Sequence, residues 1–321
     1  MDEFYRIPIG TWGRDIFDWF KETFQWLIDI FTVVVKSAVE GLVDLLLVTP
    51  TPIVILLLAL IGWYLRSWQL AVGTVISLLV VDSMGFWEST MQTLGLVIIA
   101  TLIAIAIAVP LGILAAKNDT VSAVVKPVLD FMQTMPAFVY LIPAVLLFSI
   151  GFVPGIFATV IFSLPPGVRF TELGIRGVDS ETVEAGHAFG VTPGKILRGI
   201  QLPLATPTIM AGINQVIMLA LSMAVLAGFV GADGLGKDVV AAVATQRLEL
   251  GIEAGLCVVI IAVFLDRLTA ALGNRADYPT SIRATLSRRK SNKAIAAARS
   301  RIITVPTHQS APLNILEKVA K

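Results

Sequence analysis

A long run without charged side chains, residues 90–116, most constrains what this chain can fold into. A helix needs about 20 apolar residues to cross the hydrocarbon core of a bilayer, and this run exceeds that length. Hydrophobic residues make up 56% of the 321-residue chain and charged residues only 15%, which excludes an ordinary soluble domain. The sequence therefore predicts an all-α protein that crosses a membrane several times.

Apolar segments of this kind recur, and we expect about seven transmembrane helices. They are residues 53–65, 70–81, 90–116, 137–150, 152–164, 207–230 and 252–272. The first two are short and flank Arg66, so they fit either two spans or one re-entrant element, and we adopt two spans. Residues 117–135 are interpreted as a mixed connection between the third and fourth spans.

The first part of the chain is helical in period but too charged to span a membrane. Between residues 12 and 47 a polar residue recurs every three or four positions, opposite an aromatic-rich apolar face. Such a helix is expected to lie in the membrane interface or along the outside of the bundle, and a soluble helical hairpin is the alternative. We interpret residues 1–52 as an outward-facing tail without a cleaved signal peptide, and residues 53–86 as an accessory hairpin.

Basic residues set the expected orientation. Lysines and arginines concentrate in the loops that share a side with residues 170–206 and in the C-terminal tail, which together hold 18 of the 24 in the chain. Because cytoplasmic loops are enriched in these residues, the sequence predicts a multi-pass protein of the cell membrane with its N-terminus outside. Residues 274–321 are then a basic cytoplasmic tail.

A polar stretch, EAGHAFGVTPGKILRGIQLP at residues 184–203, separates two apolar regions. It predicts a first helix that ends at Phe189, a left-handed corner at Gly190, and a second helix that Pro203 ends. Asp179 or Ser180 can cap the start of the first helix. Thr192 can cap the second helix, with Pro193 at its first position. The stretch should form a compact projection on the cytoplasmic side.

This projection resembles the EAA loop of ABC importer permeases, whose pattern is Glu-Ala-Ala, three residues, Gly, nine residues, Ile, one residue and Leu-Pro. Gly186 departs from the usual Ala, at a cost of about 1 kcal/mol in helix propensity. The resemblance implies that residues 170–206 couple the membrane bundle to an ATPase. The motif positions that it assigns to this contact are Glu184, Ala185, Gly186, Gly190, Ile200, Leu202 and Pro203, and we add Phe189 because it offers part of a small apolar face beside them.

The resemblance extends over much of the chain. Residues 130–147 and 207–223 are similar to the permease subunits of glycine betaine/proline importers, as are the short motifs at 246–248 and 266–267. It implies a type I importer permease core of five transmembrane helices at residues 87–273, and import of compatible solutes such as glycine betaine, choline or proline betaine. It also implies a second, identical permease copy, two cytoplasmic ATPase subunits and an extracytoplasmic binding protein.

The sequence itself lacks the equipment of an enzyme. It contains no Gly-x-x-x-x-Gly-Lys-Ser/Thr phosphate loop, so ATP and Mg are expected in the partner ATPase and no cofactor in this chain. The histidines, His187 and His308, are far apart and Cys257 is the lone cysteine, so no metal site is expected. Nucleic acid is not an expected partner, whereas the lipid bilayer is.

Candidates for the translocation pathway are aromatic, sulfur-containing or amide side chains within the spans. They are Phe138, Tyr140, Asn214, Gln215, Met218 and Met223. Aromatic faces attract quaternary ammonium groups, although packing, or a hydrogen bond between helices for the two amides, is the alternative for each. Two other functions stay open: a permease for another small solute such as an amino acid, and an ion-driven carrier or channel. The carrier would need charged or discontinuous spans, which this sequence hardly offers.

Overall fold

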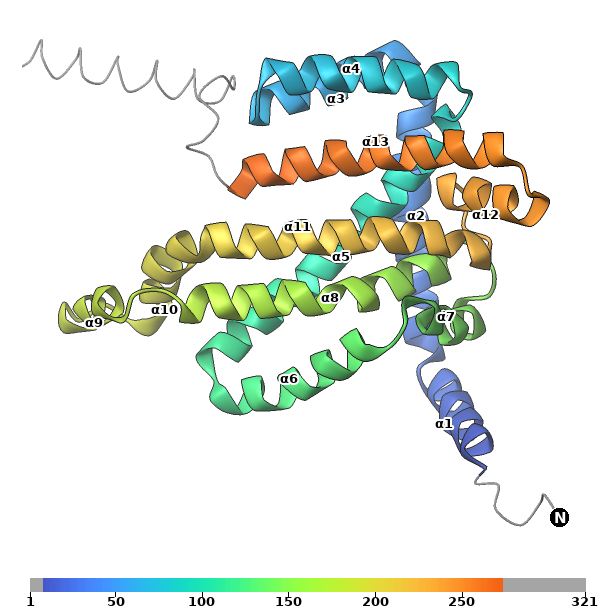
Figure 1. Ribbon diagram of the computed structural model, residues 1–321. Helices are drawn as coiled ribbons and strands as arrows, with labels where there is room; N and C mark the ends of the chain where they lie inside the picture. The colour runs from blue at the N-terminus through green and yellow to red at the C-terminus, as the bar shows by residue number, and fades with distance from the viewer. Residues whose placement is uncertain (1–7, 274–321) are drawn as a thin grey trace, which may run out of the picture.

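The computed structural model describes residues 8–273, and the predicted basic tail at 274–321 lies outside the described residues. Within that range every regular element is a helix (Figure 1). The helices are α1 (Ile9–Thr23), α2 (Gln25–Val48), α3 (Thr51–Leu65), α4 (Trp68–Ser83), α5 (Trp87–Lys117), α6 (Asp119–Thr134), η1 (Ala137–Tyr140), α7 (Leu141–Phe148), α8 (Phe152–Arg176), α9 (Ser180–Ala188), α10 (Pro193–Ile196), η2 (Leu197–Gln201), α11 (Leu202–Leu226), η3 (Ala227–Val230), α12 (Leu235–Thr245) and α13 (Leu248–Gly273).

The centre of the molecule is built from α5, α8, α11 and α13, with α8 and α11 side by side along most of their lengths (Figure 1). These helices, with α10 and η2 counted as part of the α11 rod, are the four described elements that are long and apolar enough to cross a membrane. Counting the bent pairs α2–α3 and α6–α7 raises the number to six, and α4 is a shorter apolar helix. The predicted all-α membrane fold is confirmed.

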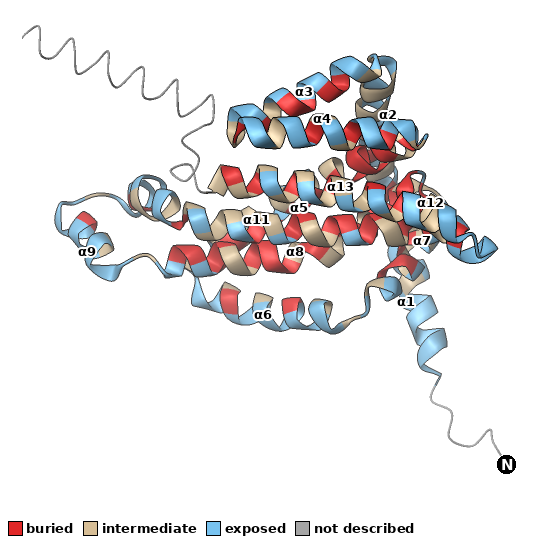
Figure 2. Ribbon diagram, turned by 45° about the horizontal axis from the view of Figure 1, so that its top comes forward, coloured by how far each residue is buried: buried red, intermediate tan, exposed pale blue. Residues whose placement is uncertain are grey.

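Small residues let α5 and α8 approach closely. Ala100, Ala104 and Ala108 recur every four residues on α5 and are fully buried, and Gly112 continues the row. A β-carbon at Gly112 would lie 2.5 Å from Cβ of Thr171 on α8, so only glycine fits there. Such small-residue stripes are how transmembrane helices gain van der Waals contact without a hydrophobic driving force. Figure 2 shows buried residues along α8 and α11 in the middle of the bundle.

The N-terminal helices lie at one end and along one side of the bundle. α1 and α2 run across the end of the bundle where α7 and α12 lie, and α2 then bends by 111° into α3 (Figure 1). α3 and α4 form an antiparallel pair beside α13, with Ser67 Oγ accepting from Leu70 N at 3.4 Å at the start of α4. The segment 53–81 is thus two helices.

The predicted location of the fourth span was wrong. Residues 117–135 are not a mixed connection: they contain α6, which Asn118 caps by accepting from Thr120 N at 2.9 Å, and which returns alongside α8. Residues 137–150 are not one span but η1 and α7, bent by 106° from α6. Pro136 disfavours the helical region for Met135, whose ψ is 132°, so the helix breaks there. Hydropathy missed α6 because its polar face lowers the average.

The prediction that Pro203 ends the second helix of the projection was wrong. α10 continues through the π-helical segment η2 into α11, which gives one helical rod from Pro193 to Val230. Pro203 lies in the first turn of α11. The helix runs through Pro203 because the looser π-helical hydrogen bonding of the preceding turn accommodates its ring.

Candidate functional site

The projecting segment, α9 with its link to α10, stands clear of the bundle at the end opposite α7 and α12 (Figures 1 and 2). Asp179 starts α9, since its carboxylate accepts from the N–H groups of Glu181 and Thr182, each at 3.3 Å. Of the two caps that the sequence allowed, the structure uses Asp179. Its negative charge also suits the positive end of the helix dipole.

The corner after α9 has the hydrogen bonds of a left-handed helix end. Gly190 N–H donates to the His187 carbonyl at 2.9 Å, and Val191 N–H donates to the Gly186 carbonyl at 3.1 Å. Gly190 has φ +72°, so the predicted left-handed corner is confirmed. Thr192 occupies the predicted cap position before Pro193, but its side chain makes no capping hydrogen bond.

Gly186 is where α9 rests on the following helix. Gly186 is buried, and a β-carbon at this position would lie 3.1 Å from Cδ1 of Ile200 and 3.4 Å from Cγ1 of Ile196. The departure from the usual Ala therefore brings α9 close to these two side chains. Within this chain, Ile196 and Ile200 hold α9 at a fixed angle to α10.

The predicted coupling residues divide into a supporting and an outward group. Gly186 is buried, and Ile200 and Leu202 are partly buried against the helical rod. The exposed members are Glu184, Ala185, Phe189, Gly190 and Pro203. The Phe189 side chain is 88% exposed at the tip, which is costly for an aromatic ring in water and typical of a contact surface.

An ion-pair network that sequence reasoning missed secures the base of the projection. The Glu172 carboxylate, only 7% exposed, lies 2.7 Å from Ser122 Oγ, 3.3 Å from Lys126 Nζ and 3.0 Å from Arg176 Nε. Arg176 also pairs with Asp119 at 2.7 Å. The network joins α6 to the last turn of α8, directly before α9. The available signal was a polar face on residues 119–126, whose partner lies about fifty residues away along the chain.

The pathway candidates fall into two places. Tyr140 and Met223 are buried together near the end of the bundle that holds α7, and the Tyr140 hydroxyl donates to the Met132 carbonyl. Phe138 is 48% exposed and its ring lies 5.2 Å from that of Phe229. The structure thus brings Phe138 of η1 and Phe229 of η3 together as one aromatic pair.

The remaining candidates lie along α11. Asn214 faces α13, where its Nδ2 donates to Asp266 Oδ1 at 3.1 Å and its Oδ1 accepts from Thr269 Oγ1 at 2.5 Å. Gln215, next in sequence, is exposed on another side, and Met218 is partly buried. Asn214 therefore makes the helix–helix bond that was the alternative to a place in the pathway. In the described range, no three histidine, cysteine, aspartate or glutamate side chains gather in a way that suits a metal ion.

Known proteins similar to this chain are transport permeases. The chain is 45% identical to the glycine betaine transport system permease protein OpuAB of Bacillus subtilis, over 84% of this chain and 95% of that protein. It is 42% identical to the glycine betaine/proline betaine transport system permease protein ProW of Escherichia coli, over 85% of this chain and 78% of that protein. The glycine betaine/carnitine transport permease protein GbuB of Listeria monocytogenes is 47% identical, over 84% of this chain and 97% of that protein.

The fold also matches solved structures. The inward-facing MetNI methionine ABC transporter aligns with a TM-score of 0.55 at 18% identity, over 59% of this chain and 95% of that one. The family model for the binding-protein-dependent transport system inner membrane component matches residues 108–278, which include α8, α11 and the projecting segment. The chain therefore belongs to this family and is a permease subunit of an ABC importer.

Proposed function

We propose that this permease forms the membrane pathway of an ATP-driven importer of glycine betaine or a related quaternary ammonium solute. The observation that carries the proposal is the similarity to three permeases named for glycine betaine transport, at 42–47% identity over 84–85% of this chain. Retention of substrate class is expected at such identity when the match extends over the membrane core rather than a single motif.

The coupling part of the proposal rests on the projecting segment. The exposed Phe189 ring, with Glu184 and Ala185 beside it, would enter a groove on a separate ATPase subunit that binds ATP and Mg. Because α10, η2 and α11 form one rod, a push on α9 would move α11 and the packed α8 with it. Two permease copies, two ATPases and an external binding protein would make the complete importer.

The ring pair of Phe138 and Phe229 is the proposed outer recognition surface. Their elements, η1 and η3, contact α7 and α12 at the end of the bundle away from α9 (Figure 1), where a solute released by a binding protein would enter. A quaternary ammonium has no N–H to donate, so attraction to ring faces suits it better than hydrogen bonds do. In this account α9 and the C-terminus are cytoplasmic and the N-terminus is outside, in keeping with the distribution of lysine and arginine.

Transport measurements in cells without other betaine carriers test this function. With its ATPase and binding protein, the chain should support uptake of radiolabelled glycine betaine that stops when ATP is depleted and is competed by proline betaine or choline. Competition by an amino acid alone would reject glycine betaine as the solute but would leave the assignment as an ATP-driven importer intact. Uptake that persists without ATP while ion gradients are intact would instead favour the ion-driven carrier.

A further inference from the structure

A line of polar side chains, the polar stripe, runs along one side of α6. At about 100° per residue, Lys126, Asp130 and Gln133 fall within about 60° of one another on the helix surface. All three residues are exposed. Val128 and Phe131 lie on the nearly opposite side of the helix and are more than half exposed. α6 therefore presents a polar surface and a separate apolar surface, and only the apolar one suits lipid.

The polar stripe carries charge deep in the membrane. The Asp130 carboxylate accepts a hydrogen bond from the Arg169 guanidinium of α8 and forms an ion pair with it. Asp130 lies about three turns beyond Asp119, the first residue of α6, which is about 16 Å along the helix axis and about half of a ~30 Å hydrocarbon core. The short side chain of an aspartate cannot reach the membrane surface from there, unlike the long side chains of lysine and arginine.

The chain itself does not cover these charges. The side chains of Asp130 and Arg169 are 65% and 39% exposed, and that of Lys126, one turn nearer the start of α6, is 57% exposed. Charged groups within a membrane face a bundle interior or a water-filled cavity, because hydrocarbon solvates them poorly. A dry contact with another protein surface would cost several kcal/mol for each ion that loses its water. Water is therefore the surroundings that suit the polar stripe.

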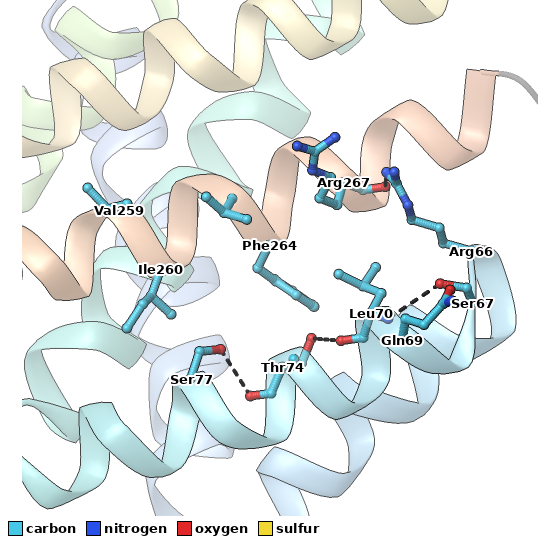
Figure 3. A pocket seen from close by; sticks show the side chains of 12 residues that line it. Arg66, Ser67, Gln69, Leu70, Thr74, Ser77, Val259, Ile260, Phe264 and Arg267 are labelled. Carbon is cyan, nitrogen blue, oxygen red and sulfur yellow. Dashed lines mark hydrogen bonds between the residues drawn. The ribbon is translucent and has the colours of Figure 1, made fainter.

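The flank of the bundle with α4 and α13 lies opposite α6 and is built differently (Figures 1 and 2). Along the groove between α4 and α13, the Thr74 and Ser77 hydroxyls donate to carbonyls of α4 at 2.8 and 3.2 Å (Figure 3). Val259, Ile260 and Phe264 form the facing wall, and charge in the lining of this groove is confined to one end. That flank suits lipid along its length, whereas the polar stripe does not.

The course of the polar stripe fits a route across the membrane. α6 starts at the end of the bundle near α9 and leads into η1, which carries Phe138 of the proposed outer recognition surface (Figure 1). We propose that the polar stripe of α6, together with Arg169, lines the water-filled passage through which solute crosses. The second permease copy of the proposed importer would form the opposite wall and keep lipid out, so this inference rests on that assembly.

Cysteine accessibility tests whether water reaches the polar stripe. Gln133→Cys and Phe131→Cys are two positions apart on nearly opposite sides of α6, and the native Cys257 is buried. The complete importer in lipid nanodiscs would be treated with a charged methanethiosulfonate reagent during ATP turnover. Because this reagent needs a thiolate in water, we expect Gln133→Cys to react about tenfold faster or more. Equal rates, or an unreactive Gln133→Cys packed against protein, would overturn the proposal.

Blocking the passage tests its role in transport. A bulky methanethiosulfonate label on Gln133→Cys, attached before reconstitution into liposomes, should stop uptake while the ATPase stays bound, and a reducing agent that removes the label should restore uptake. The matched control is the same label on Gly10→Cys of α1, which has open space around it and should leave uptake unchanged. Uptake by fully labelled Gln133→Cys would contradict the proposal. The labelling rates do not depend on the solute, so rejection of glycine betaine would leave this inference in place.

Discussion

The Glu172 carboxylate accepts a 2.7 Å hydrogen bond from the Ser122 hydroxyl, and this contact joins the last turns of α8 to α6. Lys126 and Arg176 add their charges to the same carboxylate. The projection with α9 begins a few residues later, so this network fixes the platform from which it extends.

Removal of the carboxylate should loosen that platform. We expect Glu172→Ala to lose about 2 kcal/mol of stability, because hydrogen bonds to a charged, buried group are among the stronger ones. The matched control is Asp130→Ala, which breaks the exposed pair with Arg169 and should cost less than about 1 kcal/mol. Thermal unfolding of the purified proteins would compare the stability lost in each variant. Equal losses of stability would show that the Glu172 network contributes no more than the exposed pair.

The size of residue 186 should decide whether α9 stays seated. Gly186→Ala places a methyl group 3.1 Å from the flexible end of Ile200, which can shift, while helix propensity improves by about 1 kcal/mol. Uptake should therefore remain near wild type. Gly186→Phe should abolish it by lifting α9 from α10, whereas Gly194→Phe, in open space, should not prevent α9 from seating. A functional Gly186→Phe protein would contradict this packing role.

Orientation can be read with single cysteines. Gly10 on α1 and Gly194 on α10 both have open space where a β-carbon would stand, and the native Cys257 is buried. An impermeant thiol reagent should label Gly10→Cys in intact cells and Gly194→Cys only after lysis. The reverse pattern would invert the proposed topology and place the projection outside.

The two neighbouring amides on α11 should have different effects. Asn214→Ala removes bonds to Asp266 and Thr269, which at about 0.6 kcal/mol for each intramembrane hydrogen bond costs roughly 1 kcal/mol, and it should leave solute preference intact. Gln215→Ala should leave stability intact and raise the KM for uptake, because that side chain is exposed and is our remaining polar candidate for the pathway. Unfolding curves and uptake kinetics together separate the two effects.

Local signals predicted the projection well. Asp179, Gly190 and Pro193 each favour one backbone conformation for reasons internal to a few residues, and the structure has those conformations. Pro203 misled because a proline usually stops a helix, whereas here the helix runs through it. The π-helical turn that makes this possible carries no sequence mark of its own.

Features that depend on distant parts of the chain were the ones missed. α6 was predicted as a connection because its polar face lowers its average hydropathy, and that face exists to meet Glu172 on α8. The close approach at Gly112 likewise depends on Thr171, which no local pattern links to it. Average apolarity identified the bundle, but partners across helices determine how its members pack.

The central claim is that α9 is the contact through which a separate ATPase drives this permease. Copurification of the ATPase with Phe189→Ala tests it most directly, because that ring is 88% exposed and its loss should not disturb the fold. A contact residue of this kind is worth about 2 kcal/mol, so we predict roughly 30-fold weaker ATPase binding and lost uptake at unchanged membrane level. Phe131→Ala, which removes a 66% exposed ring from α6, should bind the ATPase normally. Wild-type ATPase binding and uptake by Phe189→Ala would contradict the account.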